Sequence, residues 1–98
     1  MLEFEQAGDR ISLVGELQIS FLESLHAKLS EVVHHPGPLV LDLSQISEVD
    51  LAGLQVLLSF LRTRDNGSAT RIVGSPPVLV NALRLVGLEE AFARHMDG

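Results

Sequence analysis

The sequence predicts an α/β fold in which one β-sheet of about four strands carries helices packed against it. Segments in which apolar and polar residues alternate, as in strands, are interleaved with segments in which apolar residues recur every three or four positions, as in helices. The predicted order is strand, strand, helix, strand, helix, strand, helix, helix, which builds a single sheet through right-handed crossovers. With 98 residues the chain has room for one domain, residues 1–98.

The N-terminal third predicts a β-hairpin followed by a helix. Apolar and polar residues alternate over residues 2–5 and 10–13, and a glycine-containing turn separates the two runs. Ser20 and Glu23 have the spacing of a capping box, so a helix is expected to begin at Ser20. Its apolar stripe should consist of Leu22, Leu25, Leu29 and Val32.

The middle of the chain predicts the central strand and the next helix. Residues 39–43 are almost continuously apolar, as expected of a strand that is covered on both faces. A loop containing Ser44 and Ser47 should follow and lead to Asp50. Asp50 is a good N-cap for a helix that runs to about Thr63.

The C-terminal third predicts a fourth strand and two helices. Turn-forming residues 65–68 precede a short strand at residues 71–74. Ser75 is expected to cap the next helix, which has proline in its first turn and Gly87 as its left-handed C-cap. Residues 88–95 form a last amphipathic segment.

Composition and charge exclude several classes of function. Seven Lys and Arg residues against 13 Asp and Glu give a formal net charge of −6, and the basic residues are scattered, so we expect no nucleic-acid partner. The absence of cysteine excludes disulfides, thiolate catalysis and cysteine-type zinc sites. The longest apolar stretch, residues 51–61, is too short for the roughly 20 residues that span a bilayer, and residues 1–10 lack an apolar signal core. We therefore expect a cytoplasmic protein without direct membrane insertion.

Motifs for catalysis and for cofactors are absent from the sequence. There is no Gly-x-Gly-x-x-Gly, P-loop or Gly-x-Ser-x-Gly motif, so we expect neither an enzyme nor a cofactor. Asp42 and Asp50 could pair as an acid and a base, but no other catalytic group accompanies them, and we favour a loop-binding carboxylate and a helix cap. The histidines are expected to be solvated rather than to bind a metal: His26, His34, His35 and His95.

The helix after Asp50 has two dissimilar faces. At 100° per residue its core stripe should consist of Gly53, Leu54, Leu57, Phe60 and Leu61, with Gly53 allowing close approach to a strand. The opposite face should consist of Leu51, Ala52, Gln55, Ser59 and Arg62, with Leu58 at its flank. This face is more apolar than solvation requires, which favours a contact surface for a partner. The alternative is that Leu51 packs against the preceding loop around Ile46 and Val49.

Four segments of the sequence form a recognisable set. They read Val14-Gly15-Glu16-Leu17, Leu39-Val40-Leu41-Asp42-Leu43-Ser44, Val49-Asp50-Leu51-Ala52-Gly53-Leu54 and Leu83-Arg84-Leu85-Val86-Gly87-Leu88. Together they resemble the STAS domain, the family of bacterial anti-sigma factor antagonists that also supplies the cytoplasmic domain of sulfate transporters. The resemblance spans nearly the whole chain and implies a mixed β-sheet with helices packed mainly on one face. It also implies a non-enzymatic protein-binding module in signal transduction by partner switching.

In phosphorylation-switched members of this family, the residue after the aspartate that opens the second helix is a serine or threonine, which a partner ATPase of the histidine-kinase type phosphorylates. In this sequence the position is Leu51, which has no hydroxyl, and Gln18 stands where the family usually has an aspartate. The resemblance therefore implies a docking face without the phospho-switch. The implied partner is an anti-sigma factor, an ATPase-type kinase, or another signalling or transporter protein, and self-association stays open.

Two alternatives remain beside this main hypothesis. The chain could be the small STAS regulatory subunit of a membrane transport ATPase complex. It could also be a phosphoprotein switch that uses Ser44, Ser47 or Ser59 as a displaced acceptor. On the main hypothesis the partner-binding residues are Gln18, Asp50, Leu51, Ala52, Gln55, Leu58, Ser59 and Arg62.

Overall fold

The computed structural model describes residues 1–65 and 69–96. Its elements follow the predicted order, with a short 3₁₀ helix, η1, added before the first α-helix. The predicted turn at residues 65–68 falls mostly on residues 66–68, which lie outside the described residues. The elements are β1 Leu2–Ala7, β2 Arg10–Leu17, η1 Ile19–Phe21, α1 Leu22–Val32, β3 Leu39–Val49, α2 Leu51–Arg64, β4 Thr70–Val73, α3 Pro77–Val86 and α4 Glu89–Ala93.

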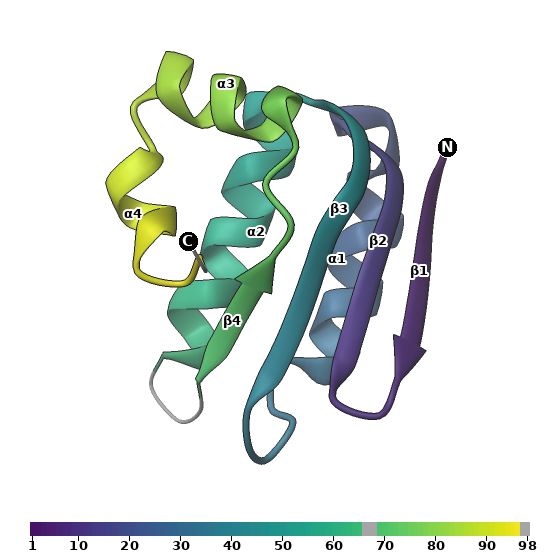
Figure 1. Cartoon of the computed structure of the whole chain (residues 1–98). Coiled ribbons are helices and arrows are strands. Elements are labelled where there is room, and N and C mark those ends of the chain that lie inside the picture. The colour runs from purple at the N-terminus through teal and green to yellow at the C-terminus, as the bar shows by residue number, and fades with distance from the viewer. Residues whose placement is uncertain (66–68, 97–98) are drawn as a thin grey trace.

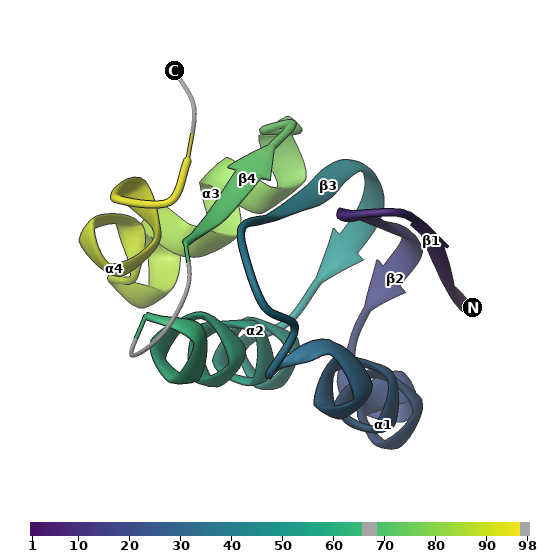
Figure 2. The ribbon, with the colours of Figure 1, turned by 90° about the horizontal axis from the view of Figure 1, so that it is seen from below.

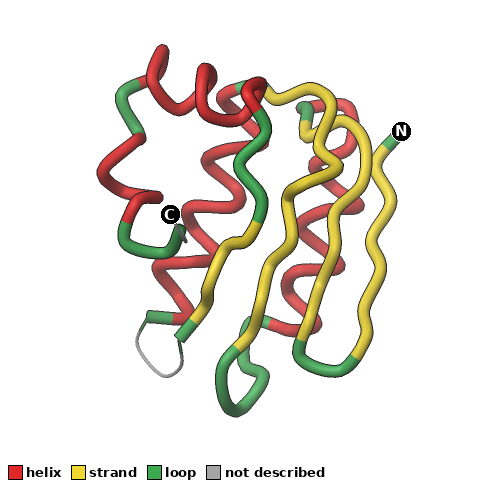
Figure 3. The backbone as a smooth tube through the Cα atoms, viewed as in Figure 1, coloured by secondary structure: helices red, strands yellow, loops and turns green. Residues whose placement is uncertain are grey.

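The four strands form one mixed sheet in the order β1-β2-β3-β4 (Figures 1 and 3). β1 and β2 form an antiparallel hairpin closed by the pair Ala7 and Arg10, whereas the β2–β3 and β3–β4 pairs are parallel. Each parallel pair is connected through a helix, first α1 and then α2. Because Leu17 pairs with Val49, β2 and β3 end side by side, and the segments that follow these two strands meet at that end of the sheet.

The sheet is covered by helices on one face. Helices α1 and α2 lie side by side on that face, and α3 and α4 flank the side of the sheet that carries β4 (Figure 2). The expectation that residues 39–43 are covered on both faces is wrong. Leu39, Leu41 and Leu43 are buried, whereas the intervening Val40 and Asp42 belong to the open face and are half-buried. An apolar run overstates burial here because a single apolar side chain such as Val40 is ordinary on an open face.

Two helix starts differ from the sequence expectation. α1 begins at Leu22 and no side chain caps it, so the capping box expected for Ser20 and Glu23 does not form. Ser20 lies inside η1, and the 3₁₀ turn occupies the position that a capping residue would take. α3 has Pro76 as its N-cap in place of Ser75, since two consecutive prolines carry the chain into the helix.

β3 is longer than expected and continues to Val49, so Ser44 and Ser47 lie in the strand rather than in a loop. The extension follows from tertiary pairing, because residues 45–49 run alongside residues 14–17 of β2 with an irregularity in register. Polar side chains on this stretch remain exposed on the strand surface. Local composition therefore signalled a loop where a neighbouring strand imposes extended backbone.

A buried arginine connects the segments at the end of the sheet opposite to the α2 N-terminus. Arg64 is 2% exposed. Its guanidinium donates to the carbonyl oxygens of His35 and Gly37 at 2.8 Å each and of Ala69 at 3.2 Å, and its Nε donates to Thr70 Oγ1 at 2.8 Å. Burial lowers the pKa of Arg64. These bonds join the end of α2 to the loop after α1 and to the start of β4.

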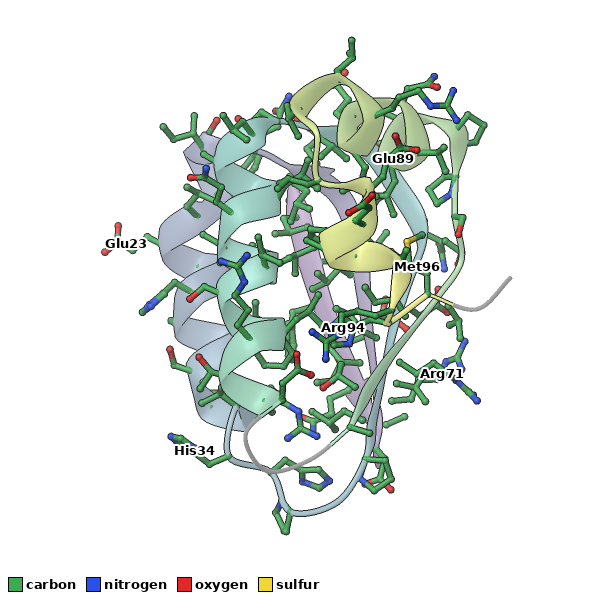
Figure 4. All side chains as sticks on the ribbon, turned by 90° about the vertical axis from the view of Figure 1, so that its left-hand side faces the viewer. Glu23, His34, Arg71, Glu89, Arg94 and Met96 are labelled. Carbon is green, nitrogen blue, oxygen red and sulfur yellow. The ribbon has the colours of Figure 1, made fainter. Side chains whose placement is uncertain are left out.

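His95 is buried, so the expectation that all the histidines are solvated is wrong for this residue. Its Nδ1 lies 3.0 Å from the carbonyl oxygen of Thr70, and its Nε2 lies 3.5 Å from Asp65. The backbone carbonyl of His95 accepts from the Ile72 amide, and Met96 forms a parallel bridge with Ile72 beside β4 (Figure 4). The C-terminal segment therefore returns to the β4 edge, and this tertiary contact buries the imidazole.

Candidate protein-interaction site

The carboxylate of Asp50 organises the point where β3 passes into α2. Its Oδ1 accepts from the Gly53 amide at 2.8 Å, which confirms the predicted N-cap, and its Oδ2 accepts from the Ile19 amide at 2.8 Å. The Asp50 amide in turn donates to the carbonyl of Leu17 at 3.0 Å. One side chain thus holds the start of α2 against the start of η1, although the two segments are far apart in sequence.

Two exposed apolar residues flank this carboxylate. Leu51, the first residue of α2, is 46% exposed, and Ile19, the first residue of η1, is 69% exposed. Nearly half of the Leu51 side chain is accessible. Leu51 is therefore not buried against the segment around Ile46 and Val49, as the alternative expected. Sequence reasoning did not single out Ile19, although the available signal was an apolar residue directly before Ser20, the predicted helix start.

The remaining residues expected at the site are divided between its surface and the core. Gln55, Ser59 and Arg62 are exposed along α2, and Ala52 is half-buried. Leu58 lines a shallow pocket beside Gln55, Ser59 and Arg62, so it flanks the exposed face as expected, but at 8% exposure it adds little area to that face. Its spacing explains the result, since Leu54, Leu57, Leu58 and Leu61 recur at three and four residues and all turn toward the core.

Gln18 lies beside the start of α2 and is engaged by a neighbour. Its side-chain amide donates to Glu48 Oε2 at 2.8 Å, across the pair of strands that ends there. Gln18 is half-buried and Glu48 is exposed. The bond joins the residue before η1 to β3 beside Ile19 and Leu51. Both oxygens of the nearby Asp50 carboxylate accept backbone amides.

A groove of about 440 Å³ runs between α1 and α2 and continues this surface along the helices. It shares Ala52, Gln55 and Ser59 with the face that the sequence predicted for partner binding. No Asp, Glu, Lys or Arg lines it. The lining residues are Leu22, His26, Leu29, Ser30, Val33, Ala52, Gln55, Val56, Ser59, Phe60 and Thr63.

The structure also shows how Asp42 is used. Its Oδ1 accepts from the Ser44 amide at 2.9 Å and its Oδ2 accepts from Arg10 at 2.7 Å. Because Ser44 lies in β3 and Arg10 in β2, the expectation that Asp42 binds a loop is wrong, and the carboxylate instead joins two neighbouring strands. Hydrogen bonds from Ser44, followed by the contribution of Arg10, hold the pKa of Asp42 below its usual value against the opposing effect of partial burial. A carboxylate with a lowered pKa is a poor general base near neutral pH, which disfavours the acid–base pairing of Asp42 with Asp50.

The part of the chain that the structure describes contains neither a metal-binding cluster nor a membrane-spanning helix. Within residues 1–65 and 69–96, no group of three or more His, Cys, Asp or Glu side chains could hold a metal ion. In the same part of the chain, no helix is both long and apolar enough to cross a membrane.

Comparison with known proteins identifies the family. A family model described as "Mlab, STAS domain" matches residues 1–95. The chain is a STAS domain. The mixed sheet with helices on one face, expected from the resemblance, is confirmed. No curated protein matches the sequence.

Solved STAS structures share the fold. An anti-sigma factor antagonist from Mycobacterium paratuberculosis is similar with a TM-score of 0.76 and 22% identity, over 92% of this chain and 80% of that one. The unphosphorylated anti-sigma factor antagonist SpoIIAA gives 0.68 and 17% identity, over 100% and 88%. The STAS domain of a SulP transporter from Vibrio cholerae gives 0.56 and 16% identity, over 94% and 75%.

Proposed function

We propose that this STAS domain is a non-enzymatic protein-binding module that docks a regulatory partner through the N-terminal end and outer face of α2. The observation that carries the proposal is the exposed pair Leu51 and Ile19, which the Asp50 carboxylate holds together at the start of that helix. Exposed apolar side chains held on a rigid frame suit a protein contact because little conformational entropy is lost on binding. STAS domains are generally regulatory rather than catalytic.

The residue at position 51 favours docking without a phospho-switch at the start of α2. Leu51 stands where phosphorylation-switched STAS domains carry a hydroxyl, and leucine cannot accept a phosphate. Gln18 replaces the usual nearby aspartate and binds Glu48. The contact would therefore be regulated by the abundance or state of the partner rather than by modification of this residue.

The partner class on this proposal is a cytoplasmic regulatory protein, such as an anti-sigma factor or an ATPase-type kinase. The proposed docking surface comprises Gln18, Asp50, Leu51, Ala52, Gln55, Ser59 and Arg62. We include Ile19 because it is exposed and bonded to Asp50 beside Leu51. Leu58 would support this surface from below rather than touch the partner, since it is buried.

The test is a titration of the ¹⁵N-labelled domain with purified candidate partners encoded beside its gene. Amide shifts that change on binding should concentrate on Ile19, Leu51, Gln55 and Arg62. Changes confined to the open face of the sheet or to α4 would contradict the proposal. Self-association is followed in the same samples by sedimentation.

A second candidate function is a STAS regulatory subunit of a membrane transport ATPase complex. It is supported by the hydroxyl-free Leu51 and by the shared fold with the STAS domain of a SulP transporter. It predicts the same surface but a different partner, so co-purification with a membrane complex distinguishes it. A phosphoprotein switch at exposed Ser44, Ser47 or Ser59 predicts instead a gain of mass of one phosphate on incubation with a cognate kinase and ATP.

A further inference from the structure

β1 is an edge strand whose outer side is open. The sheet order is β1-β2-β3-β4, so β1 has β2 on one side, and on its other side no strand pairs with it within residues 1–65 and 69–96. In Figure 1 β1 lies at the edge of the sheet, with the other strands between it and α3 and α4. An edge strand presents unpaired backbone groups that can accept a further strand.

The alternation of hydrogen-bonded and non-hydrogen-bonded pairs in the β1–β2 hairpin identifies the unpaired backbone groups. The Glu16 amide donates to the Met1 carbonyl at 3.1 Å, which makes that pair a hydrogen-bonded one. In the alternating pattern of an antiparallel ladder, Glu3 and Glu5 then direct their backbone groups toward β2. The backbone N–H and C=O groups of Leu2, Phe4 and Gln6 are directed away from the sheet, where a new strand would pair with them.

The two faces of this edge differ in chemistry. Leu2 and Phe4 are half-buried and pack against the core on the helix-covered face. Glu3 and Glu5 lie on the opposite, open face and are exposed. Neither glutamate forms an ion pair or side-chain hydrogen bond with another described residue. A strand added here would meet two carboxylates without a basic partner among the described residues on one face. On the other face it would meet the apolar side chains of Leu2 and Phe4.

We propose that β1 is a second interaction site, which takes up an extended segment of a partner protein with Lys or Arg at alternate positions and apolar residues between them. Such a segment would add a fifth strand, with its backbone bonded to Leu2, Phe4 and Gln6. Its basic side chains would then lie opposite Glu3 and Glu5, and cross-strand pairs of opposite charge favour this register. Main-chain bonds supply affinity in this mode and the alternating side chains supply specificity.

Charge disfavours a second copy of the chain as the occupant. Antiparallel pairing of two β1 strands about Phe4 would place Glu3 of each copy opposite Glu5 of the other. Like charges directly opposite each other destabilise a strand pair. The net charge of −6 adds to this repulsion, so a basic partner fits the edge better than self-association does.

The test uses a blocked peptide of alternating lysine and valine, added to the ¹⁵N-labelled full chain at low salt. We expect amide shift changes along β1 and slower hydrogen exchange at Leu2, Phe4 and Gln6. A Gln6→Pro variant removes an outward N–H while leaving the bonds to β2 intact, and should bind about tenfold more weakly. Gln6→Ala is the matched control and should bind as the wild type does.

A charge variant keeps the proposal falsifiable if the proline variant folds poorly. Glu5→Lys should also weaken peptide binding about tenfold, and a peptide with glutamate in place of lysine should not bind. Equal binding by Gln6→Pro and Gln6→Ala would overturn the proposal, because attraction would then be electrostatic without strand addition. It would equally be overturned if the wild type bound no peptide while the Glu3→Gln, Glu5→Gln double variant dimerised, since the glutamates would then serve only to keep copies apart.

Discussion

Gly53 lies so close to the backbone of Leu17 that no β-carbon fits between them. A Cβ on Gly53 would overlap the carbonyl oxygen of Leu17 and lie 2.8 Å from its Cγ. The contact places the first turn of α2 directly against the end of β2, where Asp50 and Ile19 are also joined. The predicted close approach of this helix to a strand is thereby confirmed.

A Gly53→Ala substitution should therefore destabilise the domain, although alanine is the better helix former by about 1 kcal/mol. Separating α2 from β2 by one methyl group should cost about 1–3 kcal/mol net, as overpacking in a core does. Urea unfolding followed by circular dichroism measures the change. Ser59→Ala, in an exposed turn of the same helix, is the control and should change the free energy of unfolding by less than about 0.5 kcal/mol.

A Leu51→Asp substitution tests the docking surface. If Leu51 is covered by the partner, the introduced charge should weaken the complex by about 1–3 kcal/mol, measured by titration calorimetry. The stability of the free domain should change little because the side chain is 46% exposed. Leu85→Asp is a matched control on α3, at a leucine that is 86% exposed. An unchanged affinity for the Leu51 variant would remove Leu51 from the interface.

The order of elements and the core of α2 could be predicted because both follow from periodicity. Leu54, Leu57, Phe60 and Leu61 recur with the period of a helix, and all are buried as predicted. The predicted cap at Asp50 also forms, whereas the caps expected at Ser20 and Ser75 do not. The helical period was thus accessible from the sequence, but the residue at which a helix begins was predicted correctly only for α2.

Features set by contacts between distant segments were not accessible in this way. His95 is buried because the C-terminal segment pairs with β4, and β3 extends to Val49 because β2 lies beside it. Ile19 joins the candidate site only through its bond to Asp50, 31 positions along the chain. The exposure of Leu51 could be expected from helix geometry, but the position of Ile19 beside it could be seen only in the folded structure.

Arg64 is the clearest of these nonlocal features, and it yields a further prediction. Its guanidinium donates to four carbonyl oxygens and a hydroxyl from two separate segments, the one after α1 and the one that begins β4. Arg64→Lys keeps the charge but cannot reproduce the planar set of donors, so buried carbonyls would lose their partners. We expect a loss of about 2–4 kcal/mol in unfolding free energy. Arg62→Lys, two residues away and exposed, should be neutral within about 0.5 kcal/mol.

The lowered pKa of Asp42 predicts a specific dependence of stability on pH. Because the folded state binds the Asp42 proton less tightly than the unfolded chain does, the stabilisation is complete above the unfolded pKa near 3.8 and is lost as the pH falls through the lower folded value. Asp42→Asn should therefore be less stable than the wild type by about 0.5–1.5 kcal/mol at pH 7, where it lacks the charge-assisted bonds to Ser44 and Arg10. Thermal unfolding between pH 2 and pH 7 should show the two proteins converging at the acid end. A constant difference over that range would mean that the asparagine changes packing rather than removes a titrating group.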